Sequence, residues 1–159
     1  MPIKFKEKIM AALGGGVVAI AIVLIAHFEG YESRPYRDVA GVLTVCYGHT
    51  GSDIAEGKEY SINECEELLK KDLAVAQRAV DRLVKYPLND VQRAALYSFT
   101  YNVGIGAFQS STLLKKLNAG DLDGACNQLR RWTYSGGKKW RGLEQRREIE
   151  LQLCKQEKI

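Results

Sequence analysis

Histidine and cysteine are scarce in this sequence of 159 residues, which contains two histidines and four cysteines. The cysteines form no C-x-x-C pair, and His27 and His49 stand at no ligand spacing. Structural zinc sites need four such ligands at short, regular spacings, so we expect no metal site and no cofactor. Proline is rare as well, with three residues, and the 15 glycines follow no period. Collagen-like and low-complexity chains are therefore excluded.

The chain also lacks an internal repeat, which excludes solenoid folds. A length of 159 residues corresponds to one domain, and 46% hydrophobic residues are enough for a core. The net charge is +4, and residues 127–159 hold nine Lys/Arg against four Asp/Glu. This excess suits either an anionic partner or a solvated basic helix face. Since no groove-reading module accompanies it, we expect no nucleic-acid partner.

Charge is absent from residues 9–26, and three lysines with one glutamate precede this run within residues 4–8. A basic start followed by an apolar run is the pattern that export machinery recognises. The run is compatible with a cleaved signal peptide, for which residues 19–21 offer a small-x-small site. It is also compatible with a permanent transmembrane helix, with a weak anchor that can leave the bilayer, or with a buried helix of a soluble core.

The energetics of this run favour weak anchoring. Eighteen helical residues span roughly 27 Å, slightly less than a hydrocarbon core of about 30 Å. Leu, Ile and Val occupy half of the positions and contribute about −3 to −5 kcal/mol in total. Gly14, Gly15 and Gly16 each cost about 1 kcal/mol of helix propensity relative to alanine. We therefore expect a marginal anchor.

The remaining chain predicts a small β element beside five or six helices, which is an α+β domain. Alternation of period two, with a turn at Ala40-Gly41, predicts a hairpin over residues 34–50. A capping box at Ser61 and a cap at Asn89 or Asp90 mark two helix starts. Helices are predicted over 61–83, 89–103, 110–118, 122–131 and 143–156. Glycines are expected to end the second helix (Gly104 and Gly106) and to break the chain before the last helix (Gly136-Gly137).

Two acids flank the point where the apolar run gives way to the hairpin. Glu29 follows the run and Asp38 opens the hairpin, with Thr44 on its strand. Glycoside hydrolysis requires two carboxylates that face each other across a cleft. The spacing alone does not separate this interpretation from two solvated surface acids.

The pattern E-x8-D-x5-T followed by Gly-His, here Glu29, Asp38, Thr44 and Gly48-His49, resembles the active-site signature of the T4-phage type lysozymes. The likeness covers residues 25–154. The basic, Gly/Ala-rich anchor, the four cysteines and the RRWTY-x-GG-K stretch at 130–138 resemble, within that family, the signal-arrest-release endolysins of lambdoid phages.

This resemblance implies a lysozyme-like fold and a muramidase that cleaves peptidoglycan strands for lysis of the host cell. It implies an anchor in residues 1–26, with residues 9–26 in the inner membrane, and a catalytic domain in residues 27–159. The enzyme would be exported without cleavage, held inactive at the inner membrane, and released into the periplasm as a monomer. Two alternatives stay open, a lytic transglycosylase and a membrane-anchored, non-catalytic peptidoglycan-binding protein.

The resemblance also implies roles for single residues. Glu29 would be the general acid, against an apolar wall that includes Ile25 and Phe28. Asp38 would stay ionised, and Thr44 would hold the attacking water. The family inverts the anomeric configuration, for which the two carboxyl groups stand about 6.5–9.5 Å apart.

His49 and Asn102 are candidate substrate contacts. His49 has a hydrogen bond within the hairpin as its alternative role, and Asn102 has helix capping. Cys46 stands where the broader family has glycine. Four cysteines permit three pairings, and in an oxidising periplasm we expect the pairs Cys46–Cys65 and Cys126–Cys154.

Overall fold

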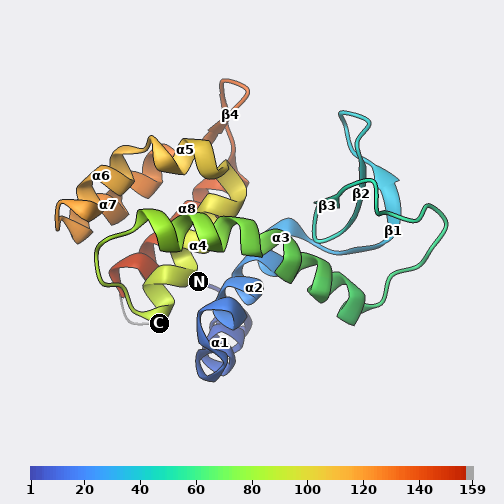
Figure 1. Cartoon of the computed structure of the whole chain (residues 1–159), viewed down its shortest axis with the longest axis horizontal. Helices are drawn as coiled ribbons and strands as arrows, with labels where there is room; N and C mark the ends of the chain where they lie inside the picture. Colours follow the sequence, from blue (N-terminus) through green and yellow to red (C-terminus); the bar gives the residue numbers. More distant parts are fainter. Residues whose placement is uncertain (157–159) are drawn as a thin grey trace.

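The chain folds into a helical part and a smaller sheet part, joined by the long helix α3 (Ile62–Leu83) (Figure 1). The structure is a computed structural model and describes residues 1–156. The sheet part contains the antiparallel strands β1 (Glu32–Arg37), β2 (Leu43–Cys46) and β3 (His49–Thr50), in that order. The helical part contains α4 (Asp90–Val103), α5 (Ile105–Gln109), α6 (Thr112–Asn118), α7 (Leu122–Asn127), the 3-10 turn η2 (Gln128–Arg131) and α8 (Arg141–Lys155). The predicted α+β, lysozyme-like class is confirmed.

The predicted helix starts are confirmed at α3 and α4. The Ser61 side chain accepts a hydrogen bond from the Glu64 amide, and the Glu64 carboxylate accepts one from the Ser61 amide. Asn89 forms the same reciprocal pair with Gln92. Each box satisfies two backbone donors that the first turn of a helix leaves unpaired.

Two local predictions are wrong. Gly106 does not end a helix but lies inside α5, because α4 already ends at Gly104, where φ is 93°. The next helix begins at Thr112, with Ser111 as its cap. Gly136-Gly137 does break the chain before the last helix, as expected, and it forms the turn of a hairpin that was not predicted, between the strands β4 (Tyr134–Ser135) and β5 (Lys138–Lys139). Strands of two residues carry too short a pattern to be recognised in the sequence.

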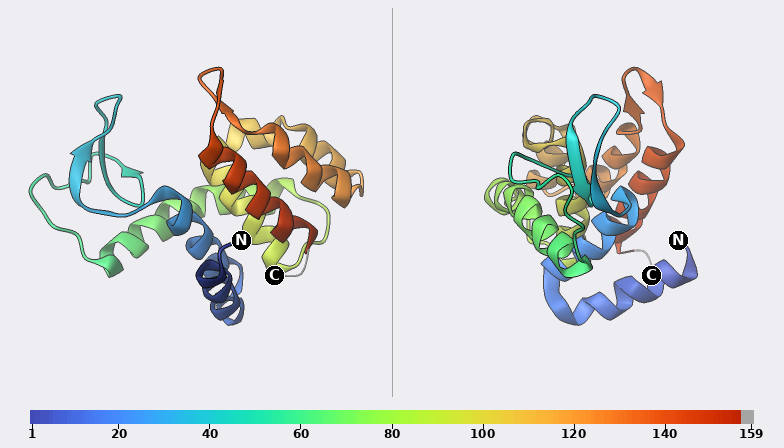
Figure 2. Two further views of the ribbon diagram at one scale, coloured as in Figure 1. Left: turned by 180° about the vertical axis from the view of Figure 1, so that it is seen from behind. Right: turned by 90° about the vertical axis from the view of Figure 1, so that its right-hand side faces the viewer.

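The N-terminal apolar run is bent and packed onto the helical part. Helix α1 (Ile3–Ala12) is followed by the 3-10 turn η1 (Leu13–Gly15) and by α2 (Gly16–Glu29), so that α1 folds back along α2 (Figure 2). Helix α2 packs on α4 through four fully buried residues, Ile20, Ala21, Leu24 and Ile25. The segment Ile3–Glu29 has the length and hydropathy to cross a membrane, yet in this conformation it completes the core of the domain.

Two disulfides tie distant segments together, in the pairs expected from the sequence. Cys46 on β2 bonds to Cys65 on α3, and Cys126 on α7 bonds to Cys154 on α8. Cys46 has a φ of 61°, in the left-handed region that favours glycine. The backbone therefore requires a glycine-like conformation at this position, and the disulfide to α3 holds a cysteine in it.

Candidate active site

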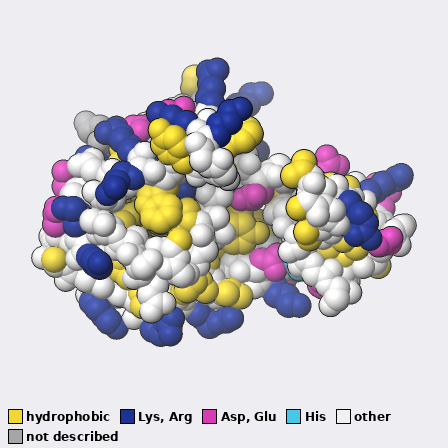
Figure 3. Space-filling model, turned by 90° about the horizontal axis from the view of Figure 1, so that it is seen from above, with side chains coloured by type: hydrophobic (Ala, Val, Ile, Leu, Met, Phe, Trp, Pro, Cys, Tyr) yellow, Lys and Arg dark blue, Asp and Glu magenta, His cyan; other side chains and the backbone are white. Residues whose placement is uncertain are grey.

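A hollow separates the helical part from the sheet part on the face seen from above (Figure 3). Acidic side chains border it, apolar side chains form part of its floor, and Lys and Arg side chains lie around it. The end of α2 leads directly into β1, so the chain crosses from one part to the other at residues 29–32. Glu29 stands at this crossing, with Asp38, Thr44 and His49 in the sheet part and Asn102 in the helical part.

Glu29 is the last residue of α2, and Gly30 ends the helix with a φ of 73°. Its side chain is 26% exposed. One oxygen, Oε1, lies 2.7 Å from Nη1 of Arg146 on α8. The other, Oε2, is so close to the turn after β2 that a Cβ built on Gly48 would lie 3.6 Å from it. The carboxylate is thus held between the two parts of the molecule.

The wall beside Glu29 is cationic, so the predicted apolar wall is wrong. Ile25 is fully buried in the core, and the Phe28 ring lies 4.9 Å below the guanidinium carbon of Arg146. Arg146 also binds Glu150, with 3.1 Å between Nε and Oε1, and donates to the Ser98 carbonyl. Because Glu150 is fully buried and paired with Arg147 as well, this network fixes the position of the Arg146 charge.

Asp38 lies at the tip of the hairpin, exposed to solvent. Its Oδ1 accepts hydrogen bonds of 2.9 Å from the amides of both Ala40 and Val42. These bonds orient the carboxylate and leave Oδ2 for a water or a substrate. The turn Asp38–Val42 is closed by a backbone bond from the Asp38 amide to the Val42 carbonyl.

Thr44 follows on β2 and is 5% exposed. Its hydroxyl donates to the Val42 carbonyl at 3.0 Å. A hydroxyl whose hydrogen is already committed can only accept from a further partner. Thr44 therefore offers an acceptor on the same strand that follows the Asp38 turn.

His49 connects the sheet to α3. Its Nδ1 lies 2.7 Å from Asp72 and its Nε2 lies 3.0 Å from Asp53. Burial alone lowers the pKa of His49, but the hydrogen bonds and charges of Asp72 and Asp53 outweigh burial and raise this pKa above its usual value of 6.5. Both ring nitrogens are therefore occupied by carboxylates.

Asn102, near the end of α4, is exposed, and its Oδ1 accepts from Nη2 of Arg147 at 2.9 Å. This bond leaves the side-chain NH2 group of Asn102 free to donate toward the outside.

The pKa of the neighbouring Tyr101 responds to charges on several elements around it. Its pKa is raised first by burial and then by the charges of Asp72 and Glu29, while Arg146 opposes the shift.

No site role was expected for Arg146 or Asp72, and Gly48 was named only as part of the Gly-His motif. Arg146 and Arg147 both pair with acids of the protein itself. The spacing of Arg146 and Arg147 to Glu150, four and three residues, is the signal that could have placed all three on one buried helix face. No local sequence pattern predicts that Arg146 pairs with Glu29.

Comparisons with known proteins give matches over most of the chain. A family model described as phage lysozyme matches residues 26–150. The chain is 54% identical over 155 residues to a SAR-endolysin of bacteriophage PS119, covering 94% of this chain and 93% of that protein.

Two solved structures extend the comparison. A P22 phage lysozyme mutant has a TM-score of 0.78 and 34% identity, and the match covers 84% of this chain and 94% of that one. The active form of the P1 phage endolysin Lyz has a TM-score of 0.79 and 25% identity, and the match covers 100% of this chain and 96% of that one. The latter match includes the folded-back N-terminal helices.

Proposed function

Since the chain belongs to the phage lysozyme family, we propose that it is the muramidase of a phage endolysin and hydrolyses the β-1,4 bond between N-acetylmuramic acid and N-acetylglucosamine in peptidoglycan. Bond cleavage by this enzyme lyses the host cell. The observation that carries the proposal is the position of the Glu29 carboxylate, with Oε1 on Arg146 of the helical part and Oε2 beside Gly48, in the turn that follows the strand of Thr44.

Glu29 acts as the general acid in this proposal. In its protonated form it donates from Oε2 to the glycosidic oxygen while Oε1 stays against Arg146. The carboxylate that remains after proton transfer then has a cation 2.7 Å away. Because Arg146 is anchored to Glu150 and Ser98, this charge needs no rearrangement to stabilise the product of the proton transfer.

Asp38 and Thr44 prepare the attacking water. A water that donates one hydrogen to Oδ2 of Asp38 and the other to Oγ1 of Thr44 presents its free lone pair to the anomeric carbon. The two amide bonds to Oδ1 support this orientation of Asp38. Asp38 then accepts the proton as the new bond forms, on the face of the sugar opposite to Glu29, and the configuration inverts.

Asn102 contacts the glycan in this proposal: Arg147 occupies its side-chain oxygen, and its NH2 group donates to an N-acetyl carbonyl. A substrate contact by His49 requires the ring to give up one of its carboxylate partners, so its first role is to hold the hairpin against α3.

The N-terminal segment takes two conformations in this proposal. Residues 9–26 lie in the inner membrane after export, as the anchor of an enzyme whose catalytic domain begins near residue 27 on the periplasmic side. On release the segment leaves the bilayer and folds into the domain as α1 and α2. The likeness over the whole chain to the active form of the P1 endolysin supports the folded-back state as the working state of a periplasmic monomer.

The test is peptidoglycan solubilisation by the purified wild-type protein beside Glu29→Gln, with a reducing-end assay and mass analysis of the fragments. We expect hydrated reducing-end products from the wild type and none from the variant. Anhydro products would mean that the enzyme is a lytic transglycosylase and not a hydrolase. Full activity in Glu29→Gln would remove Glu29 from the mechanism, and an inactive wild type that still binds peptidoglycan would favour a binding protein.

A further inference from the structure

Three aromatic rings meet directly behind the Glu29–Arg146 pair. Phe5 on α1 is 4% exposed and stacks flat on His27, with 3.9 Å between ring centroids and 17° between ring planes. It also meets the edge of Phe28, with centroids 6.3 Å apart. His27 and Phe28 are the two residues of α2 that precede Glu29. Phe5 is therefore the part of α1 that contacts the last turn of the helix carrying the acid.

The contacts continue from Phe28 to the acid. The Arg146 guanidinium lies 4.9 Å above the Phe28 ring, and the same guanidinium holds Oε1 of Glu29 at 2.7 Å. A cation over an aromatic face is attracted to it, so the position of the ring influences the position of the charge. Phe28 thus supports the Arg146 side of the ion pair.

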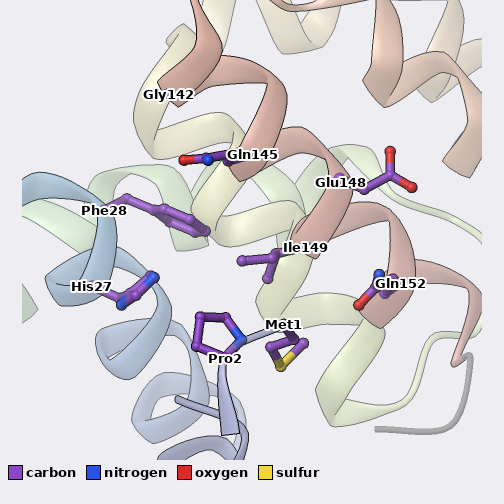
Figure 4. A pocket seen from close by; sticks show the side chains of 9 residues that line it. All are labelled: Met1, Pro2, His27, Phe28, Gly142, Gln145, Glu148, Ile149 and Gln152. Atoms are coloured by element: carbon purple, nitrogen blue, oxygen red, sulfur yellow. The ribbon is translucent and has the colours of Figure 1, made fainter. Parts of the chain in front are cut away.

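Helix α8 leaves a space beside the rings of His27 and Phe28 (Figure 4). A pocket of about 490 Å³ lies between the N-terminus, the end of α2 and α8. Its lining comprises Met1, Pro2, His27 and Phe28 together with Gly142, Gln145, Glu148, Ile149 and Gln152 of α8. Helix α8 does not fill the space next to Phe28, so it does not hold the Phe28 ring from that side as Phe5 does from the other. When Phe5 is lost, the Phe28 ring can move into the pocket.

We propose that Phe5 is a positioning residue for the reaction: docking of α1 holds His27 and Phe28, and through them keeps Arg146 and Glu29 in their working arrangement. The inference rests on the proposed function and concerns Phe5 alone. Phe5 precedes the anchor at residues 9–26, so before release it lies on the other side of the bilayer from the catalytic domain. The Phe5 contacts therefore form only when the segment folds back.

The experiment compares Phe5→Leu and Phe5→Ala with Ile9→Ala in the purified full-length protein. Phe5→Leu keeps an apolar side chain in place of the flat ring. Ile9 is the matched control, because it is fully buried on the same helix and forms no ring contact with α2. The measurements are kcat and KM on peptidoglycan, at a temperature well below the melting point of each variant, and hydrogen exchange of the amides of residues 27–30.

We expect both Phe5 variants to lower kcat by about 10- to 100-fold with little change in KM, since small misplacements of a catalytic group have effects of this size. Exchange at residues 27–30 should rise in both. Ile9→Ala should lower the melting temperature but keep kcat within about twofold of the wild type.

Equal losses of kcat in the Phe5 and Ile9 variants would overturn the inference, because general loosening of α1 would then explain the effect. Unchanged exchange at residues 27–30 in the Phe5 variants would overturn it regardless of activity. A wild-type protein with no hydrolytic activity would count against the proposed function instead, and the exchange data would still decide whether Phe5 supports the end of α2.

Discussion

Glu29 and Arg146 are 117 residues apart in the chain, and their side chains meet with 2.7 Å between Oε1 and Nη1. The contact joins the C-terminal end of α2 to α8. On the far side of the guanidinium lies Glu150, which is fully buried. The segment proposed to leave the membrane is therefore attached to the catalytic domain by a charge pair at the candidate active site, in addition to its apolar packing.

Replacement of Arg146 should affect stability and activity together. Arg146→Gln removes one of the two cations that compensate Glu150, and breaking such a buried pair costs about 3–5 kcal/mol. It also leaves the Glu29 carboxylate without its partner, so kcat should fall. Urea denaturation and hydrolysis rates check both effects. Lys70→Gln, at the exposed pair with Glu67, is the control and should change neither. A fully active Arg146→Gln would show that the pair does not serve the reaction.

The conformation of Cys46 yields a prediction about which residue replaces it best. In a Cys65→Ser background, where the disulfide is absent, Cys46→Gly should be more stable than Cys46→Ala by about 1 kcal/mol, because φ is 61° and an alanine there is strained. The order should reverse at Cys126, in α7, where glycine weakens a helix. Chemical denaturation of the four double variants, with Cys154→Ser as the background for Cys126, measures both orders. A Cys46→Ala variant at least as stable as Cys46→Gly would contradict the left-handed assignment of Cys46.

The raised pKa of His49 predicts how stability depends on pH. The folded state binds the proton more tightly than the unfolded chain, whose histidine has a pKa near 6.5. The stabilisation is therefore fully present below pH 6.5 and is lost as the pH rises through the folded-state pKa. The difference in unfolding free energy between wild type and Asp72→Asn, measured from pH 5 to pH 9, should be largest at the acidic end. A difference that grows with rising pH would contradict this assignment.

The fold was predictable where the signal is local. Ser61 with Glu64 and Asn89 with Gln92 mark helix starts within four residues, and both helices begin there. Helix α5 and the β4–β5 hairpin were not predictable, because five- and two-residue elements form through their packing and turn rather than through a periodic pattern.

The candidate site divides in the same way. Glu29, Asp38 and Thr44 lie within 16 residues of each other in the chain and form a recognisable motif. Arg146 is opposite Glu29 only because α8 packs on α4, which in turn packs on α2. A contact that depends on three packed helices has no signature in the order of the residues, and for this reason the expectation of an apolar wall was wrong.

The proposed water position predicts the stereochemistry of the product. A water held by Asp38 and Thr44 attacks the face opposite to Glu29 when the two carboxyl groups stand about 6.5–9.5 Å apart, and a β-linked strand then yields the α-anomer first. Proton NMR of early digests resolves the anomers before mutarotation equalises them. Thr44→Val should slow the reaction without changing the anomer. A β-anomer as first product would mean a covalent intermediate and a different role for Asp38.

The three consecutive glycines separate two explanations of membrane release. Leucine at Gly14–Gly16 should lock the enzyme in the bilayer by hydropathy alone. Alanine is the sharper probe, because each of Gly14→Ala, Gly15→Ala and Gly16→Ala adds only one methyl group. In the folded-back state a Cβ at Gly14 meets nothing within 4 Å, a Cβ at Gly15 would lie 2.7 Å from the Ala19 Cβ, and Gly16 has a φ of 79°. In a straight membrane helix all three alanines fit equally.

If fold-back draws the segment out of the bilayer, Gly14→Ala should be released almost as the wild type is, while Gly15→Ala and Gly16→Ala should stay in the membrane fraction and remain inactive. Sedimentation of membranes at successive times after expression measures the released fraction. Equal retention of the three variants would mean that apolarity alone sets release, and that the bend between α1 and α2 follows release without driving it.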